Sequence, residues 1–224
     1  MERWPDVTEA TVAQSLALRN EGRFHEAQAV LERAAQHAPR TPSIALAQSD
    51  IAIRLGKFHD ALAYAEDGIA ESDPIAYAEE HRDLLINAAI AARRIGRIDR
   101  ARCYVEIAYA MDACDPFTNL QLAKVCLLEH RAHDAAASAT RAIANVHVDD
   151  ALDIITGAAE IILDPNIAPA TTLAQRAIAR AARAIRMRAP RSLATSELLE
   201  ALRTATDTIE ESAVATLTHL LHPA

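Results

Sequence analysis

Two histidines, His130 and His133, come nearest to a metal site in this chain, because Glu129 and Asp134 stand beside them. Imidazole and carboxylate groups one helical turn apart can hold a cation such as Zn²⁺. Both histidines, however, fall where one helix is expected to turn into the next, and two exposed histidines are ordinary there. We therefore predict no metal site and no cofactor.

Motifs for nucleophilic or phosphate chemistry are missing from the sequence. It contains no glycine-rich phosphate loop, no GxSxG and no HExxH. Cys103, Cys114 and Cys126 lack CxxC spacing and form an odd set, which favours buried thiols in a reducing compartment. We predict that the protein is not an enzyme. The alternative is a cryptic active site, which would show a deep polar pocket with strongly shifted pKa values.

A basic segment at residues 170–188 offers anion binding instead. Its periodicity predicts an amphipathic helix with Arg176, Arg180 and Arg183 on one face. These arginines form a candidate anion-facing surface for a phosphate, an acidic partner or a membrane. The opposite face carries mostly Ala and Ile rather than bulky residues, which argues against a membrane. A solvated face, or one paired with the acidic last helix at about 195–221, is the plainer interpretation.

The elements that position such residues follow from a repeated hexapeptide. The letters GRFHEA, GKFHDA and GRIDRA begin at Gly22, Gly56 and Gly96, 34 and then 40 residues apart. A weaker copy, HRAHDA, begins 34 residues later at His130. Glycine suits a turn that needs positive φ, and the recurring small alanine lets two helices cross closely. A period of this length predicts a helical repeat array whose helix pairs stack to bury their apolar faces.

The recurring residues resemble the tetratricopeptide repeat (TPR) family, with about four repeats over residues 8–148. Thr41-Pro42 and Asp115-Pro116 fit an N-cap followed by Pro in the first helical turn. The resemblance implies an all-α fold, a right-handed α-solenoid of stacked antiparallel helix pairs. We expect residues 1–148 to form these repeats and residues 149–224 to continue and cap them within one continuous domain.

In proteins of this family the first helices of successive units line a concave groove that receives an extended peptide or a helix. The resemblance places these residues in the groove: Val12, Leu16, Arg19, Asn20, Leu46, Asp50, Ile53, Arg54, Ile86, Ile90, Arg93, Arg94, Phe117, Leu120, Lys124 and Leu127. Cations outnumber the single acid, Asp50, so we hypothesise an acidic or amphipathic peptide as the ligand. Solvated helix ends are the alternative. The carboxylate clamp of chaperone-binding members is matched only by Asn87, so we do not expect a co-chaperone of that type.

The function predicted from the sequence is a non-enzymatic adaptor that binds a protein or peptide. The alternatives are a TPR-like sensory or regulatory module of a bacterial transcription or signalling system, and a secretion-type chaperone. The net charge of −8 argues against direct binding of nucleic acid. Arg greatly exceeds Lys, which hints at a bacterial source. No apolar run is long enough to span a membrane, so we expect a cytoplasmic protein, and a homodimer remains open.

Overall fold

The computed structural model describes residues 5–37, 41–144, 151–172, 176 and 179. Within these residues every regular element is helical. The contacts divide the chain into an N-terminal unit, Met1–Met111, and a C-terminal unit, Asp112–Ala224. The structure therefore confirms the predicted all-α fold class, and each unit is described by itself below.

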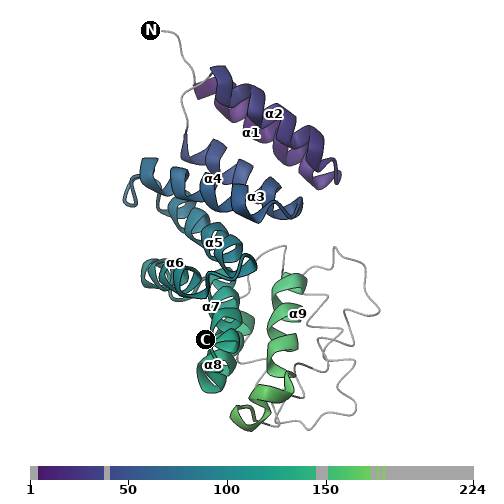
Figure 1. The fold of residues 1–224 in the computed structure, drawn as a ribbon, viewed down its shortest axis with the longest axis vertical. Helices are drawn as coiled ribbons and strands as arrows, with labels where there is room; N and C mark the ends of the chain where they lie inside the picture. Colours follow the sequence, from purple (N-terminus) through teal and green to yellow (C-terminus); the bar gives the residue numbers. More distant parts are fainter. Residues whose placement is uncertain (1–4, 38–40, 145–150, 173–175, 177–178, 180–224) are drawn as a thin grey trace. The chain divides into compact units, whose positions relative to one another are not determined.

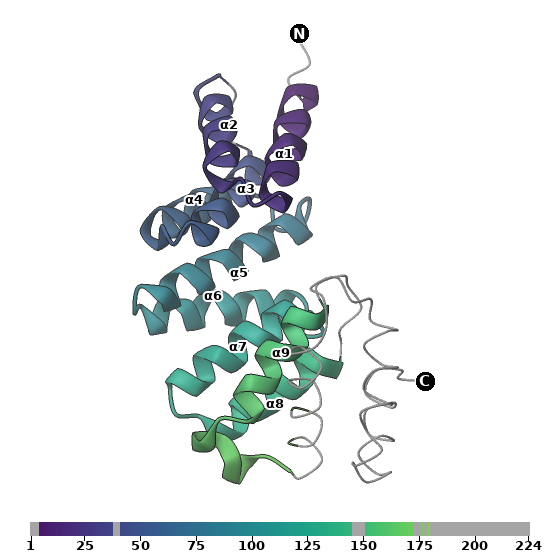
Figure 2. The same ribbon diagram turned by 90° about the vertical axis from the view of Figure 1, so that its right-hand side faces the viewer.

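The N-terminal unit consists of three helix pairs (Figures 1 and 2). They are α1 (Pro5–Asn20) with α2 (Phe24–His37), α3 (Pro42–Arg54) with α4 (Phe58–Glu71), and α5 (Ala78–Arg94) with α6 (Ile98–Met111). The first helices contact one another in sequence, α1 with α3 and α3 with α5, and α2 and α4 each pack against the first helix of the next pair. This is the stacking that the hexapeptide period predicts.

The turn inside each pair has the backbone conformation that the repeated glycine predicts. Gly22, Gly56 and Gly96 have φ values of 76°, 73° and 80°. His130, at the equivalent position of the fourth copy, has φ 59° although it has a side chain. At all four turns this residue and the next donate backbone hydrogen bonds to carbonyls three and five residues earlier, which closes the helix in a Schellman motif. The fourth copy is therefore a true repeat despite its lost glycine.

Small residues lie where the two helices of a pair cross. The alanine that closes each hexapeptide is fully buried in every copy, at Ala27, Ala61, Ala101 and Ala135. Gly68 on α4 is tighter still, because a Cβ atom there would lie 2.7 Å from Cδ2 of Leu84 and 2.8 Å from Cβ of Ala45. The spacing of small residues thus sets how closely α4 approaches α3 and α5.

Both predicted helix caps are present. The Thr41 hydroxyl accepts a hydrogen bond of 3.3 Å from the Ile44 amide, and the Asp115 carboxylate accepts one of 2.6 Å from the Thr118 amide. The extra length of the third unit is shared between a loop and its first helix: α5 has 17 residues where α3 and α7 have 13. Ser72 at the end of α4 hydrogen-bonds His81 on α5 and so ties the two ends of this loop together.

The C-terminal unit begins with another pair, α7 (Pro116–Leu128) and α8 (Ala132–Ala144). Helix α9 (Ala151–Ile162) packs against both helices, and the 3-10 helix η1 (Pro165–Ala170) packs against α8 and α9. Its core is built from aliphatic residues of these helices, among them Leu120, Ala139, Ile154, Ile155 and Ile162. Helix α9 therefore covers the pair as the first helix of a further unit would.

Several sequence predictions lie outside the described residues. They include the basic helix beyond Arg176 and Ala179, and the last helix at 195–221. The predicted domain boundary at residue 148 remains a prediction. Among the helices that the structure describes, none is long and apolar enough to cross a membrane.

Candidate functional site

Twelve of the predicted groove residues lie on α1, α3 and α5 of the N-terminal unit, and nine of these twelve are called the first-helix surface below. They are Leu16, Arg19, Asn20, Asp50, Ile53, Arg54, Ile90, Arg93 and Arg94. Leu16 is 38% exposed, and Ile53 and Ile90 are half-buried. Two other expected groove residues, Ile86 and Leu120, are instead buried at 6% and 5% exposure, because their side chains pack into the core. Lys124 lies half-buried on α7 of the C-terminal unit.

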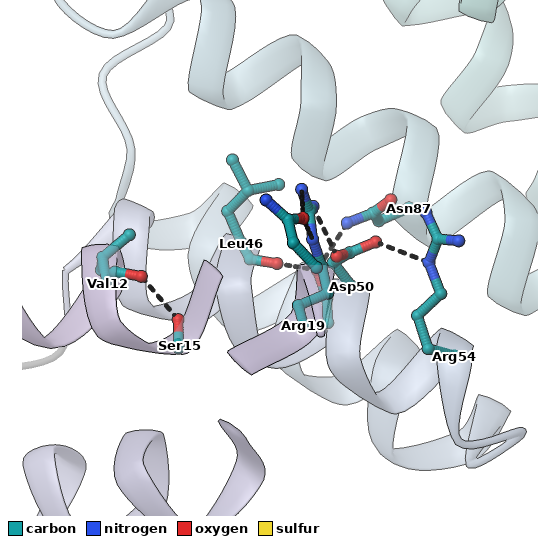
Figure 3. A network of polar contacts seen from close by, with 9 residues as sticks. Val12, Ser15, Arg19, Leu46, Asp50, Arg54 and Asn87 are labelled. Atoms are coloured by element: carbon teal, nitrogen blue, oxygen red, sulfur yellow. Dashed lines mark hydrogen bonds and ion pairs between the residues drawn. The ribbon is translucent and has the colours of Figure 1, made fainter. Parts of the chain in front are cut away.

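Asp50 is the hub of a polar network on this surface (Figure 3). Its Oδ2 atom lies 3.0 Å from Nη1 of Arg19, and its Oδ1 atom lies 3.7 Å from Nε of Arg54. The Arg19 guanidinium also donates to the side-chain oxygen of Asn20, at 3.2 and 3.3 Å. One carboxylate thus contacts Arg19 and Arg54, two of the arginines that were predicted to bind an acidic ligand.

A partly buried hydrogen bond links α3 and α5. The Asn87 amide donates to Oγ of Ser49 at 2.8 Å, and the Ser49 hydroxyl donates to the Leu46 carbonyl, also at 2.8 Å (Figure 3). Ser49 is fully buried. From the sequence, Asn87 was noted only as a match to the carboxylate clamp. In the structure its amide donates a hydrogen bond from α5 to α3.

Arg93 and Arg94 lie at the end of α5. Unlike Arg19 and Arg54, they have no carboxylate of the described residues beside them. The Arg94 guanidinium lies over the Phe58 ring, with 4.4 Å from Cζ to the ring centroid, an attractive cation–π geometry. Arg93 is half-buried, and its Nε atom is buried without a hydrogen-bond partner. Burial, together with the charge of Arg94, lowers the pKa of Arg93. Within the part of the chain that the structure describes, no acidic group pairs with either residue.

The second helices form their own contacts on another face of the N-terminal unit. Lys57 donates to Gln28 at 2.8 Å, and both Arg100 and the Tyr104 hydroxyl donate to Oε1 of Glu66. Burial and the Glu66 carboxylate raise the pKa of Tyr104 to about 12. A cavity of about 10 Å³ between α2, α3 and α4 has room for about one water molecule, too little for a substrate.

The cysteine prediction is partly wrong. All three are free, as expected, but Cys103 and Cys114 are exposed and only Cys126 is buried. Cys103 lies on the outer side of α6 and Cys114 in the loop before α7, where helix packing requires no apolar residue.

The remaining candidates are placed as follows. His130 forms the turn described above and is exposed, as is His133. No group of three or more potential metal ligands occurs among the described residues. Of the anion-facing arginines only Arg176 is described, and its Nε atom is buried without a hydrogen-bond partner. Arg180 and Arg183 lie outside the described residues.

No family model and no curated protein matches this sequence. Solved structures do match. A thermophilic TPR protein, TTC0263 of Thermus thermophilus, is 18% identical with a TM-score of 0.61, covering 96% of this chain and 98% of its own. BtubC (BKLC) of P. vanneervenii is 16% identical with a TM-score of 0.59, covering 84% of this chain and 85% of its own.

A tetratricopeptide repeat protein of Parabacteroides merdae ATCC 43184 is 12% identical with a TM-score of 0.55, covering 97% of this chain and 85% of its own. Sequence identities this low support a conclusion about the fold alone. Together with the repeated helix pairs and their four equivalent turns, these matches show that the chain has the tetratricopeptide repeat fold.

Proposed function

We propose that the protein is a non-enzymatic adaptor whose first-helix surface is a groove for a peptide or helical segment that carries acidic residues. The observation that carries this proposal is the pair Arg93 and Arg94, two cations without an acidic partner in the described structure, on the same helix as the half-buried Ile90. Such a combination of apolar and cationic groups suits an amphipathic acidic segment. The similarity to TPR proteins of solved structure supports a protein ligand.

The apolar part of the ligand would contact Leu16, Ile53 and Ile90. These side chains come from three adjacent first helices and remain partly exposed. The Asn87–Ser49 hydrogen bond fixes α5 against α3, so the surface is organised before a ligand arrives. A preorganised surface loses less conformational entropy on binding.

Electrostatics favours an acidic ligand at one end of the surface. The whole chain has a net charge of −8, and the Asp50 carboxylate, shared by Arg19 and Arg54, cancels one of their two charges. The uncompensated charge of Arg93 and Arg94 therefore stands out against an acidic background. Such segregation of charge steers an oppositely charged partner and disfavours cationic ones.

A cytoplasmic location is part of the proposal. Cys103, Cys114 and Cys126 are all unpaired, and two of them are exposed. Free exposed thiols persist in a reducing compartment, whereas disulfides accumulate in oxidising ones.

Site-specific photocrosslinking tests the proposed groove. The photoreactive residue p-benzoylphenylalanine would replace Leu16 in one variant and Ile90 in another. The matched control replaces Ile107, an apolar residue of α6 that is 49% exposed. We expect Leu16 and Ile90 to crosslink in native lysate to one contiguous segment of one protein, rich in Asp or Glu, that Ile107 does not reach. Crosslinks to unrelated proteins, or equal crosslinking from Ile107, would contradict the proposal.

A further inference from the structure

The turn between α5 and α6 differs from the equivalent turns in how its charges are compensated. In each repeat a cation follows the residue with positive φ: Arg23, Lys57, Arg97 and Arg131. These four positions share the same backbone hydrogen bonds. Differences in their partners therefore reflect the surrounding side chains and not the backbone.

In the first and fourth turns two acids hold the cation. Arg23 lies 2.9 Å from Glu21 and 2.6 Å from Glu26. Arg131 lies 3.4 Å from Glu129 and 2.7 Å from Asp134, which occupy the same two positions relative to the turn. In the second turn Lys57 donates instead to Gln28.

The third turn has lost both acids. Ile95 and Arg100 stand where the first turn has Glu21 and Glu26, and Arg100 is itself paired with Glu66 at 2.5 Å. Arg97 is exposed, and within the described part of the chain it makes no ion pair. Arg93 and Arg94 lie four and three residues earlier in the chain, at the end of α5.

We propose that Arg93, Arg94 and Arg97 form a binding site for carboxylates, which takes two or more neighbouring Asp or Glu side chains of a peptide. The name "arginine turn" is used for these three residues. Guanidinium groups bind carboxylates with two parallel hydrogen bonds, a geometry that Lys does not offer. The peptide nature of the ligand rests on the proposed function; the carboxylate chemistry rests on the arginine turn itself.

Two features of Arg93 and Arg94 support the proposal. The buried Nε atom of Arg93 has no hydrogen-bond partner, whereas buried polar groups are normally paired. The Arg94 guanidinium is held over the Phe58 ring, which restricts its rotamers before binding. At the other end of the first-helix surface Arg19 is already paired with Asp50. The ligand's acidic residues are therefore expected at the C-terminal end of α5.

NMR titration of the full chain with the acidic tetrapeptide acetyl-Asp-Glu-Asp-Glu-amide tests the site directly. The arginine Nε–Hε signals report each side chain, and single Arg→Lys variants assign them. We expect saturable shifts for Arg93, Arg94 and Arg97 and none for Arg23, which is held by its own acids. No shift at the arginine turn, or equal shifts at Arg23, would overturn the proposal. Tighter binding of inorganic phosphate than of the tetrapeptide would overturn the commitment to carboxylates.

A matched pair of variants tests Arg97, which the arginine turn adds to Arg93 and Arg94. Arg97→Gln and Arg33→Gln each remove one exposed arginine, from the arginine turn and from α2, respectively. We expect Arg97→Gln to weaken tetrapeptide binding about tenfold and Arg33→Gln to change it less than about twofold. Equal effects would overturn the proposal. Circular dichroism confirms that both variants are folded.

The two proposals can fail separately. If Leu16 and Ile90 crosslink one acidic segment but Arg97→Gln binds it as the wild type does, the arginine turn is wrong and the groove stands. If the tetrapeptide binds at the arginine turn but the two positions crosslink no common segment, the groove is wrong and the carboxylate site stands.

Discussion

The guanidinium of Arg19 on α1 lies 3.0 Å from the carboxylate of Asp50 on α3, 31 residues further along the chain. The same carboxylate lies 3.7 Å from Arg54 on its own helix. Asp50 thus joins two helix pairs and also cancels one of the two positive charges that Arg19 and Arg54 bring to the first-helix surface (Figure 3).

Replacing Asp50 by Asn would release both arginines while keeping the shape of the side chain. We expect a small loss of stability, about 0.5–1 kcal/mol, because the pair is partly exposed. We also expect tighter binding of acidic peptides, with a steeper dependence on salt. Urea unfolding and fluorescence anisotropy measure the two effects. The control is Glu26→Gln, which removes one of the two acids that hold Arg23, outside the first-helix surface. Unchanged or weaker peptide binding by Asp50→Asn would contradict the role given to Asp50.

Because Gly56 and His130 occupy equivalent turns with positive φ, removing glycine at one and adding it at the other should change stability in opposite directions. Gly56→Ala should destabilise the protein by about 1 kcal/mol, because the backbone is left-handed there. His130→Gly should stabilise it by up to about 1 kcal/mol for the same reason. No atom lies within 4 Å of a Cβ at Gly56, so backbone strain alone sets its effect.

Gly68→Ala serves as the control for these turn variants. Its φ is not positive, but its added methyl group would overlap Leu84 and Ala45, so we expect a loss of about 1–3 kcal/mol from overpacking. Urea midpoints rank the three variants. A stability of His130→Gly below that of the wild type would contradict the equivalence of the four turns.

The raised pKa of Tyr104 should make the stability of the fold depend on pH in the alkaline range. Burial and Glu66 raise its pKa to about 12, so the folded protein holds the phenolic proton more tightly than the unfolded chain. The stability that this proton contributes is complete below about pH 10 and is lost as the pH rises towards about 12. Tyr104→Phe should therefore be less stable than the wild type at about pH 8, and the difference should narrow by about pH 11. Urea midpoints at both values measure it, and a constant difference would contradict this assignment.

Arg93 should lower the stability of the fold while it contributes to binding of an acidic ligand. A half-buried cation without a partner costs folding free energy, as its lowered pKa indicates. Arg93→Met keeps much of the side-chain volume and should raise the urea midpoint while it weakens binding of the acidic tetrapeptide. Arg33→Met, at an exposed site on α2, is the control for added apolar surface. A clear loss of stability in Arg93→Met would mean that the guanidinium has a partner inside the protein.

The sequence predicted the features that local backbone and packing rules dictate. The hexapeptide located four turns and their crossing alanines because positive φ and close helix contact restrict the residue type. The Thr and Asp caps before Pro42 and Pro116 were visible for the same reason. Such rules act within a few residues, so the residue types they require can be recognised in the sequence.

Tertiary pairing was much less visible. The contact of Arg19 with Asp50 spans 31 residues, so counting cations along the first helices overstated the free charge. Ile86 and Leu120 were assigned to the groove by register, yet their side chains are buried. The loss of acids around Arg97 could have been found from the sequence, by comparing Ile95 and Arg100 with the acids of the first and fourth turns.

The most direct test of the account is the affinity of the segment crosslinked at Leu16 and Ile90, prepared as a synthetic peptide, for the wild type and for the double variant Arg93→Glu, Arg94→Glu. Circular dichroism would first establish that the variant is folded. We predict that charge reversal weakens binding by at least about a hundredfold, because two attractive pairs become repulsive. Equal affinity of the two proteins would contradict the claim that the end of α5 recognises an acidic partner.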